Sequence, residues 1–595
     1  MRSPQDVAPR LPHSPYRKWW LLGGVVVVLI LLVSLRSVAS LYTDRLWFSS
    51  VGLTSVWNTL LSVKLGLFAA FFGLFFVLLW VSLVVCDRLT ALVEGTSAED
   101  ELVRRYQRVV RPYARRIYAC LAALVALIAA AGTVGEWQNW LLFIHGQSFG
   151  FSDPQFHMDA SFYVFKLPFL EFLVNWLIVS LIVVLVFTAV FYYLNGGIRT
   201  QRSPKVSPVV KAHLSVLLAV IALVKAGGYV LARYQLVTST NGFVEGAGYT
   251  DVHARIPALS LLFWISLAAA AVLLWNIRRQ GWTLPILAVG LWAFVALVIG
   301  VIYPAASQAI VNPSQNSKEA PYITRNIAAT RYAYGLEHVA VSDFADSGEL
   351  TATQVEQGEK TLSNIRLWDP DPQISLPTFQ KLQYSHGYYS FQGLSVDRYD
   401  IDGSMQPVLT GVRQINPTGI ASQTWVNTHL QYTHGEGIVI AQSAQSNSRE
   451  PVFTVQGVPP TSASGWPKVT QPDVYFGLDD PGYVVGNTKE DEIGTGDAHY
   501  QGKGGVQLSS FWKRAAFAVR LGDLNLLISN QLTDQSRIMF VRDIQERAQK
   551  AAPFLSWDAD PYAVLADNGQ IYWILDGYTT TSSFPYSQNA SSVLV

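Results

Sequence analysis

The chain has 595 residues and a formal net charge of +1, and 50% of its residues are hydrophobic whereas 14% are charged. Soluble proteins usually carry about 25% charged residues, so this composition excludes an ordinary soluble protein. A net charge so close to zero also predicts no general attraction to nucleic acid. Long uncharged runs fill the first half of the chain, and the residues after about 304 read as a water-soluble mixture. We therefore expect two regions in two different solvents.

Seven long apolar segments occupy the first region. A helix needs about 20 mainly apolar residues to cross the roughly 30 Å of hydrocarbon in a bilayer. All seven segments meet this length, and tryptophans lie near several segment ends, as interfacial aromatic residues do. The sequence predicts a polytopic α-helical membrane domain with spans at 19–41, 61–86, 116–135, 169–194, 211–233, 256–276 and 283–303.

Positive charge alternates between the loops that join these segments. Cytoplasmic loops carry an excess of lysine and arginine. One set of loops holds only Arg45, Lys166 and Arg255, whereas the alternate set is rich in both residue types. The rich set is Arg2, Arg10, Arg17, Lys18, Arg88, Arg104, Arg105, Arg108, Arg111, Arg115, Arg116, Arg199, Arg202, Lys205, Arg278 and Arg279. The alternation predicts a multi-pass plasma-membrane protein with a cytoplasmic N-terminus and an extracytoplasmic C-terminal region.

The predicted topology divides the chain into three parts. They are a cytoplasmic arm at 1–18, a seven-helix transmembrane domain at 19–303 and an extracytoplasmic domain at 304–595. The two cysteines, Cys86 and Cys120, lie at or inside membrane segments. The outer domain therefore has no disulfide, and its stability depends on the size of its core.

Helix and strand patterns alternate in the outer domain. Apolar residues at helical spacing predict helices at 318–334, 350–365 and 534–551. Strands are predicted at 387–401, 437–443, 514–522 and 525–529, and an exposed loop at 441–466. The runs 562–566 and 571–575 flank Asp567-Asn568-Gly569, a strong hairpin signal. This mixture predicts an α+β domain with mainly antiparallel sheet.

Several long phrases of the chain carry a resemblance to a known family. They include "FHMDASFYVFKLPFL", "GAGYTDVHARIPAL", "NPSQNSKEAPYITRNIAATRYAYGLE", "WVNTHLQYTHGEG", "GKGGVQLSSFWKRAAFAVRLGDLNLLIS" and "IYWILDGYTTTSSFPYSQ". From its first span to its last residue the chain resembles uncharacterised protein family 0182, bacterial membrane proteins with seven predicted spans and a large extracytoplasmic domain. The resemblance implies fold and topology, and it carries over no activity, cofactor or catalytic residue. Members typically continue past the equivalent of Gln588, so we expect this chain to be C-terminally short.

The stretch 425–437 places His429, His434 and Glu436 close together. Histidine zinc ligands often recur at i and i+4 on one helix face, and the two histidines here are five residues apart. That spacing also does not suit one face of an uninterrupted strand. We expect a strand over 428–432 that enters a glycine turn, with the histidines in a structural role. A polar-ligand or catalytic site and a metal site are the alternatives, and the expectation is no metal and no cofactor.

Three functions remain open at this point. We expect an envelope scaffold, sensor or assembly partner, with the lipid bilayer and envelope proteins as partners and no recognisable enzyme site. An envelope enzyme acting on a lipid-linked or glycan substrate would need convergence of residues such as His386, His429, His434, Glu436, Asp397 or Asp400. A transporter would need a polar cavity around Lys225, an ionisable residue inside the fifth span.

Overall fold

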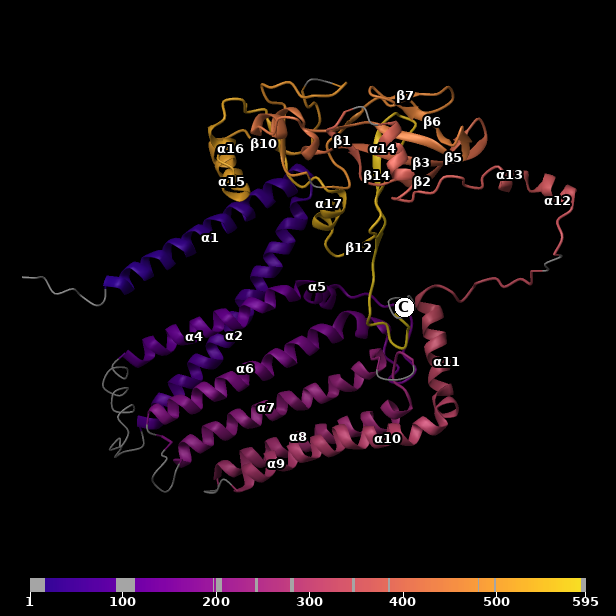
Figure 1. The fold of residues 1–595 in the computed structure, drawn as a ribbon. Coiled ribbons are helices and arrows are strands. Elements are labelled where there is room, and N and C mark those ends of the chain that lie inside the picture. Colours follow the sequence, from indigo (N-terminus) through magenta and orange to yellow (C-terminus); the bar gives the residue numbers. More distant parts are fainter. Residues whose placement is uncertain are drawn as a thin grey trace, which may run out of the picture. The chain divides into compact units, whose positions relative to one another are not determined.

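The computed structural model describes residues 17–91, 113–195, 197–198, 206–240, 244–278, 283–344, 348–383, 386–479, 481–496 and 499–589 (Figure 1). Most of the predicted cytoplasmic arm and of the basic loops that were predicted to be cytoplasmic lies outside these ranges. The chain forms two compact units. Unit 1 comprises Met1–Thr59 and Ala345–Thr580, and unit 2 comprises Leu60–Phe344 and Thr581–Val595. Each unit collects the residues that lie in contact with one another, so the predicted boundaries at residues 18 and 303 stay predictions.

Unit 2 is built from helices, of which α6, α7 and α8 lie side by side (Figure 1). The helices are α2 (Thr54–Ala91, which begins in unit 1), α4 (Ala114–Ala131), α5 (Trp137–His145), α6 (Leu167–Leu194), α7 (Pro208–Gln235), α8 (Ile256–Trp275), α9 (Thr283–Leu297), α10 (Tyr303–Val311) and α11 (Gln315–Ala333). Their packing uses small residues: α4 buries Ala122, Ala126 and Ala130, four residues apart on one face. Such a face lets neighbouring helices approach closely.

Six helices among the described residues are long and apolar enough to cross a membrane. They are Thr54–Thr90, Ala114–His145, Phe162–Leu194, Pro208–Thr238, Asp251–Arg278 and Ile286–Ala309. These helices contain or largely overlap the second to seventh predicted segments. The first predicted segment, 19–41, lies within α1 (Arg17–Ser50), which is not among the six. The membrane-type helical region is therefore present, and the count of seven spans is not confirmed.

Three of the described unit 2 helices follow a π-helical turn and have proline as their second residue. The turns are η3 (Phe162–Lys166), η5 (Asp251–Arg255) and η7 (Val298–Ile302), and each precedes a helix with proline at its start. Proline lacks an N–H, and its ring clashes with the carbonyl four residues earlier. A widened turn accommodates both effects without ending the helix.

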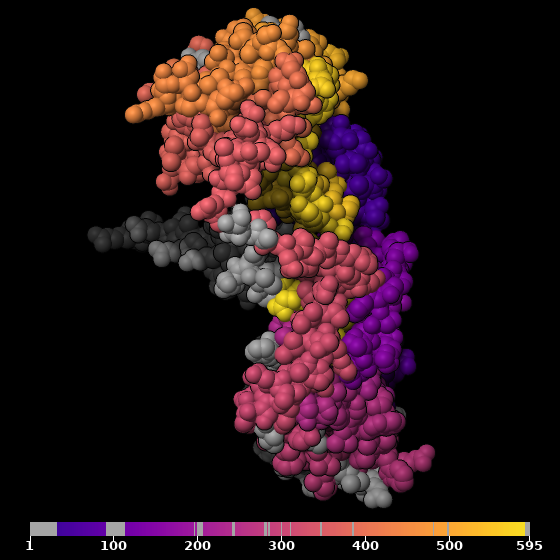
Figure 2. Space-filling model, turned by 90° about the vertical axis from the view of Figure 1, so that its right-hand side faces the viewer, coloured from indigo at the N-terminus to yellow at the C-terminus, as the bar shows by residue number. Residues whose placement is uncertain are grey.

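The last described residues of the chain, 581–589, belong to unit 2. Asn326 of α11 donates its side-chain amide to the carbonyls of Tyr586 and Glu245 at 2.9 and 3.0 Å. Gln588 donates its backbone N–H to Thr330 on the same helix. Figure 1 shows α11 following α10, and Figure 2 shows residues of α11 on the surface of this unit. The predicted helix over 318–334 is confirmed, and it begins slightly earlier than predicted.

Unit 1 is centred on an antiparallel sheet. The strand order is β1-β3-β5-β6-β7, and β2 also pairs with β3. The strands are β1 (Tyr389–Phe391), β2 (Ser395–Ile401), β3 (Ser404–Ile415), β5 (Ile438–Asn447), β6 (Glu450–Gln456) and β7 (Thr461–Ser462). Smaller antiparallel sheets are β10-β11-β9, β12-β15, β13-β14 and β4-β8. The prediction of an α+β region with antiparallel sheet is confirmed.

Unit 1 also contains short helices and the strands of the smaller sheets. The helices are α12 (Ala352–Gln357), α13 (Glu359–Leu362), α14 (Ser375–Leu382), α15 (Phe511–Leu521), α16 (Asn525–Ile528), α17 (Ile544–Ala551) and the π-helix η10 (Asn427–Gln431). The small-sheet strands are β4 (Gly435–Glu436), β8 (Asp473–Val474), β9 (Val484–Gly486), β10 (Val506–Gln507), β11 (Arg537–Met539), β12 (Ser556–Trp557), β13 (Tyr562–Leu565), β14 (Ile571–Ile574) and β15 (Gly577–Tyr578). The predicted hairpin at Asp567–Gly569 is confirmed by the β13–β14 pair.

Both faces of the main sheet are covered by buried apolar side chains. Val408 of β3 and Ile440 of β5 belong to one core cluster, whereas Leu409 and Val439 belong to another. Because successive residues of a strand point to opposite faces, these four side chains line both faces of the sheet. This is why consecutive apolar residues occur at Val408–Leu409 of β3 and at Ile438–Ala441 of β5.

Several predictions for unit 1 are wrong, and the helix predicted at 534–551 is confirmed only over α17 (Ile544–Ala551), because Arg537–Met539 form β11. Residues 514–522 and 525–529 form helices α15 and α16 instead of strands, and most of the predicted loop 441–466 is strand. Ser510 caps α15 by accepting the backbone N–H of Lys513, and Gly522 ends the helix at φ +71°. A short apolar run fits a buried helix face or a buried strand equally well, so periodicity alone does not separate them.

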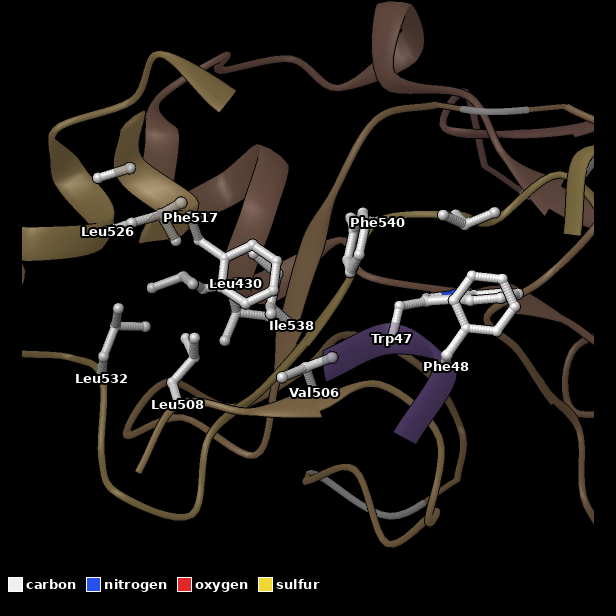
Figure 3. Packing of buried hydrophobic residues seen from close by; sticks show 13 residues of the cluster. Trp47, Phe48, Leu430, Val506, Leu508, Phe517, Leu526, Leu532, Ile538 and Phe540 are labelled. Carbon is white, nitrogen blue, oxygen red and sulfur yellow. The ribbon is translucent and has the colours of Figure 1, made fainter. Parts of the chain in front are cut away.

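The last turns of α1 belong to the core of unit 1. Trp47 and Phe48 pack in the cluster that contains Leu430, Phe517 and Phe540 (Figure 3). Two ion pairs support this packing, because Asp44 contacts Arg520 at 2.7 Å and Lys550 at 2.6 Å. The helix that contains the first predicted span is therefore joined to unit 1 through its C-terminal end.

Candidate functional site

A histidine and two carboxylates converge beside a small sheet of unit 1. His434, Glu436 and Asp473 each offer a ligand atom, and these atoms lie within 4.8 Å of one another. His434 and Glu436 are two residues apart, so their side chains leave the extended segment on the same side. Glu436 of β4 lies directly opposite Asp473 of β8. Directly opposite residues of an antiparallel pair hold their side chains on one face of the sheet.

Glycine allows β4 to reach this position. A Cβ atom at Gly435 would collide with the backbone carbonyl of Arg413 in β3. Gly437 adopts φ +68°, a left-handed conformation that glycine tolerates without strain. The glycine turn expected from the sequence is therefore present, and it brings Glu436 against the edge of the main sheet.

Arg413 is fully buried behind this turn. Its guanidinium donates to the backbone carbonyl of Glu436 at 3.3 Å and to the backbone and side-chain oxygens of Gln383 at 3.2 and 3.1 Å. Burial lowers the pKa of Arg413 to about 10, although Glu436 and Tyr389 oppose that shift. The group stays charged at neutral pH, and it holds the backbone of β4 in place.

A hydrogen-bond chain orients the imidazole of His434. Nδ1 lies 2.8 Å from the Thr433 hydroxyl, and that hydroxyl donates to Glu492 at 2.5 Å. Glu492 also accepts the Tyr475 hydroxyl at 2.7 Å. Burial by itself raises the pKa of Glu492, but hydrogen bonds from His434, Thr433 and Tyr475 outweigh it and lower the pKa below its usual value. Because the Thr433 proton goes to an ionised Glu492, the Thr433 oxygen accepts from Nδ1–H of His434.

The other ring nitrogen faces the two remaining carboxylates. The His434 side chain is 1% exposed, and within the described part of the chain its Nε2 has no hydrogen-bond partner. The Asp473 Oδ1 atom lies 3.6 Å from it. A Cβ atom placed on Gly494 would lie 2.5 Å from Nε2 and 3.0 Å from Glu436 Oε2. Nε2 and the Glu436 carboxylate therefore point toward the same spot.

Glu436 is held by the loop that contains Gly494. Thr495 donates its backbone N–H to Glu436 Oε2 at 3.2 Å and its hydroxyl to Oε1. The Tyr389 hydroxyl reaches Oε2 at 3.5 Å. Burial and the negative charge of Glu436 raise the pKa of Tyr389, so its phenol stays protonated as a donor. These contacts fix the carboxylate in one orientation.

His429 lies apart from this cluster, although it is only five residues from His434. The predicted strand over 428–432 is wrong, because these residues form most of the π-helix η10. The ring of His429 packs between Trp425 and Tyr483, and Nδ1–H donates to the Trp425 carbonyl at 3.2 Å. Burial lowers the pKa of His429, so the ring is neutral near pH 7. A structural role for His429 stays a prediction.

The other candidate residues do not join the cluster. His386 is exposed and stacks on Tyr388, and Asp397 and Asp400 lie along β2 with no place in the group of three. Lys225 lies in α7, with its ammonium 5.2 Å from the centre of the Tyr229 ring. Sequence reasoning missed Asp473 and Glu492. The spacing of two between His434 and Glu436 was the one local signal of the site.

Unit 2 contains a separate cavity of about 500 Å³. It is lined at the ends of α6, α7 and α8 by polar side chains that include Glu171, Gln235 and Arg255. Arg255 pairs with Asp251 at 2.7 Å. Lys225 does not line this cavity, so the polar cavity around Lys225 that a transporter would need is not the one observed here.

Fold and site together define a membrane-type protein: six apolar helices of spanning length accompany an α+β unit with a buried histidine–carboxylate cluster. The chain belongs to the Uncharacterised protein family (UPF0182), which matches residues 21–594. It is 41% identical to a UPF0182 protein of Frankia casuarinae over 95% of this chain and 57% of that protein. It is 36% identical to a UPF0182 protein of Streptomyces coelicolor over 98% of this chain and 59% of the relative.

The relationship extends beyond these two organisms. A UPF0182 protein of Cupriavidus necator is 36% identical over 99% of this chain and 65% of its own length. The chain thus spans little more than half to two thirds of the curated relatives that it matches. No solved structure matches the chain. These similarities establish the family, and the names of these relatives state no activity.

Proposed function

We propose that this chain is a multi-pass plasma-membrane protein that holds unit 1 on the extracytoplasmic side, where it acts as a scaffold or assembly partner of the cell envelope. The alternation of positive charge between the loops carries the proposal. Loops rich in lysine and arginine stay in the cytoplasm, and the charge-poor loops alternate with them along the chain. This pattern supports a position of the segment after residue 304 outside the cytoplasm.

The attachment of α1 supports a position of unit 1 close to the bilayer. The predicted span 19–41 ends only a few residues before Asp44 and Trp47, which are packed into unit 1. Unit 1 also exposes large apolar side chains beside that attachment: Trp512 is 75% exposed and Phe511 is 61% exposed, both on α15. Aromatic side chains of this kind are enriched at membrane interfaces and at protein–protein contacts.

The closed geometry of the histidine–carboxylate cluster favours a scaffold over an enzyme. His434 and Glu436 are buried, and the small cavity lined by Tyr475 and Arg542, of about 10 Å³, includes neither residue in its lining. Sites for small organic ligands usually measure about 300–1,000 Å³. The burial of His434 and Glu436 therefore supports a structural role over direct contact with a glycan.

Cysteine labelling in intact cells tests the orientation. In a Cys86→Ala, Cys120→Ala background, we expect Ser446→Cys, at the exposed tip of the β5–β6 hairpin, to react with a membrane-impermeant maleimide. The matched control is Tyr113→Cys, at an exposed position near a predicted cytoplasmic loop, which should react only after permeabilisation. The reverse pattern would refute the proposed topology.

Photocrosslinking from position 512 tests the scaffold role. A photoreactive phenylalanine analogue replaces Trp512, and the control carries it at Tyr572, an exposed aromatic position elsewhere in unit 1. A discrete protein adduct at 512 that is absent at 572 supports an assembly partner. Adducts with lipid alone, or equal adducts at both positions, count against a protein partner on this surface.

The cavity of unit 2 favours one second candidate, action on a lipid-linked substrate. Its volume of about 500 Å³ and its polar lining side chains, which include Glu171, Gln235 and Arg255, suit a polar headgroup. Native mass spectrometry of the detergent-extracted chain is the measurement. Retention of a defined lipid by the wild type and its loss on Glu171→Gln would support this candidate, and equal lipid content would remove it.

A further inference from the structure

The buried cluster of unit 1 has the donor set of a metal site. One imidazole nitrogen and two carboxylates face one another with their ligand atoms within 4.8 Å. The three residues come from two segments that are distant in sequence and are brought together by the β4–β8 pair. We propose that His434, Glu436 and Asp473 bind one divalent first-row transition-metal ion, with Nε2 of His434 as the nitrogen ligand.

The tautomer of His434 is the first independent support. Because Nδ1–H is directed at Thr433, Nε2 is the ring nitrogen that can offer a lone pair. That lone pair is buried, has no hydrogen-bond partner among the described residues and faces the Glu436 and Asp473 carboxylates. A nitrogen lone pair directed at carboxylates is unfavourable unless a proton or a metal cation lies between them. A metal ion satisfies all three groups at once.

The surroundings of the ring also match those of metal-bound histidines. A histidine ligand usually donates its second N–H to an oxygen acceptor, which fixes the ring and makes it more basic. Here Nδ1 contacts the Thr433 hydroxyl at 2.8 Å, and Glu492 accepts the hydroxyl proton at 2.5 Å. Glu492 is itself held by Tyr475 and by the backbone N–H groups of Asn487 and Tyr500. This arrangement holds Nε2 in the direction of the two carboxylates.

Two glycines keep the space in front of the ligand atoms clear. A side chain on Gly494 would press on Nε2 and on Glu436, and one on Gly496 would press on the Asp473 carboxylate. Between them, Thr495 donates to both oxygens of Glu436 and orients the carboxylate. The loop therefore covers the cluster with the backbone of its two glycines and with the polar donors of Thr495.

The donor set indicates the class of metal. Imidazole nitrogen suits zinc, copper, iron and nickel, whereas calcium prefers a shell of six to eight oxygens. One nitrogen and two carboxylate oxygens fit a four-coordinate ion such as Zn²⁺ whose last position is taken by water. The ion would link β4 to β8 in a unit whose sequence contains no cysteine, and so would stabilise the fold in place of a disulfide.

Binding of Co²⁺ and Zn²⁺ to the full chain tests the proposal. The chain, purified in detergent without a polyhistidine tag and stripped with chelator, is titrated with Co²⁺. We expect one Co²⁺ per chain, visible d–d absorption and displacement by Zn²⁺. His434→Gln and Asp473→Asn should weaken Co²⁺ binding by more than about 100-fold, and Thr433→Ala by about 10- to 100-fold. His386→Gln, which changes an exposed histidine outside the cluster, should leave the affinity unchanged.

Thermal unfolding gives a second readout that does not require a ligand variant to fold. Zn²⁺ should raise the unfolding temperature of the stripped wild type. The same Zn²⁺ concentration should raise the unfolding temperature of Thr433→Ala by a smaller amount. Folded wild type that takes up no stoichiometric Co²⁺, or the same affinity in folded His434→Gln, would overturn the proposal. Binding of Ca²⁺ that excludes Co²⁺ at equal concentration would overturn the assignment to a transition metal.

Discussion

His429 and His434 show that environment decides what a histidine does at the scale of single residues. The ring of His429 packs against Trp425 and Tyr483, and its Nδ1–H donates to a backbone carbonyl. Both its ring and its N–H group are therefore engaged in packing contacts. His434 instead makes its Nδ1 contact with Thr433 and turns Nε2 toward carboxylates. The same residue type, five positions apart, therefore has a packing role in one case and a ligand geometry in the other.

The burial of His429 predicts a pH dependence of stability. Burial lowers its pKa in the folded state below the ordinary 6.5, so between these two values the unfolded state binds more protons. The stabilising contribution is complete above pH 6.5 and is lost as the pH falls through the folded-state pKa. Pulse proteolysis of the solubilised chain in urea at pH 7.5 and at about pH 5 measures it. We expect His429→Gln to reduce the loss of stability on acidification.

The control for this measurement is His386→Gln, which removes an exposed histidine. This variant should lose as much stability between the two pH values as the wild type. An equal loss in the wild type and in His429→Gln would contradict the prediction.

At the scale of elements, the site depends on how closely β4 approaches β3. The strand β4 is only two residues long, yet it places Glu436 opposite Asp473 because Gly435 lets its backbone pass against the Arg413 carbonyl. A larger residue at this position has no room. The arrangement of the cluster thus depends first on the close backbone contact between Gly435 and Arg413, and only then on the side chains of the cluster.

Gly435→Ala should therefore destabilise unit 1. The added Cβ would collide with backbone, which cannot move without displacing β3, so we expect a loss of about 1–3 kcal/mol. The free energy of unfolding from urea pulse proteolysis is the measurement. Gly393→Ala is the matched control, because a Cβ there would meet only the Leu478 side chain at an ordinary 3.6 Å. A cost at Gly435 no larger than at Gly393 would refute the steric explanation.

At the scale of the whole molecule, the chain divides into units that do not follow sequence order. Unit 1 combines the first 59 residues with residues 345–580, so α1 is part of the same unit as the sheets. Asp44 lies more than 400 residues before its partners Arg520 and Lys550 in sequence, and it contacts both at 2.7 and 2.6 Å. These contacts close a long loop of chain, and the packing of Trp47 completes the attachment.

The double ion pair predicts that Asp44→Asn weakens unit 1. All three side chains are only partly exposed, at 20–30%, so the loss should fall between that of surface and buried pairs, about 1–2 kcal/mol. Asp534→Asn is the control, because Asp534 is 80% exposed in its pair with Arg514 and should cost less than about 0.5 kcal/mol. Similar urea midpoints for the two variants would contradict the expected role of Asp44.

Several features of this protein could be predicted from local sequence. The six apolar helices, the helix at 315–333 and the β13–β14 hairpin were predictable, because span length, helical periodicity and an Asn-Gly turn are properties of neighbouring residues. The same local reasoning failed for α15, where an apolar run suits strand and helix alike. It also left the count of spans and the orientation in the membrane as predictions.

The sequence by itself determined the membrane-type helices and the family, because hydrocarbon thickness and long shared phrases act through contiguous residues. Only the tertiary structure decided that Asp473 and Glu492 join His434 and Glu436, and that His429 does not. The physical reason is that the cluster forms through the β4–β8 pairing and through a loop more than 50 residues away. Such non-local contacts leave no periodic signal in the chain, so the site became visible only when the fold brought its residues together.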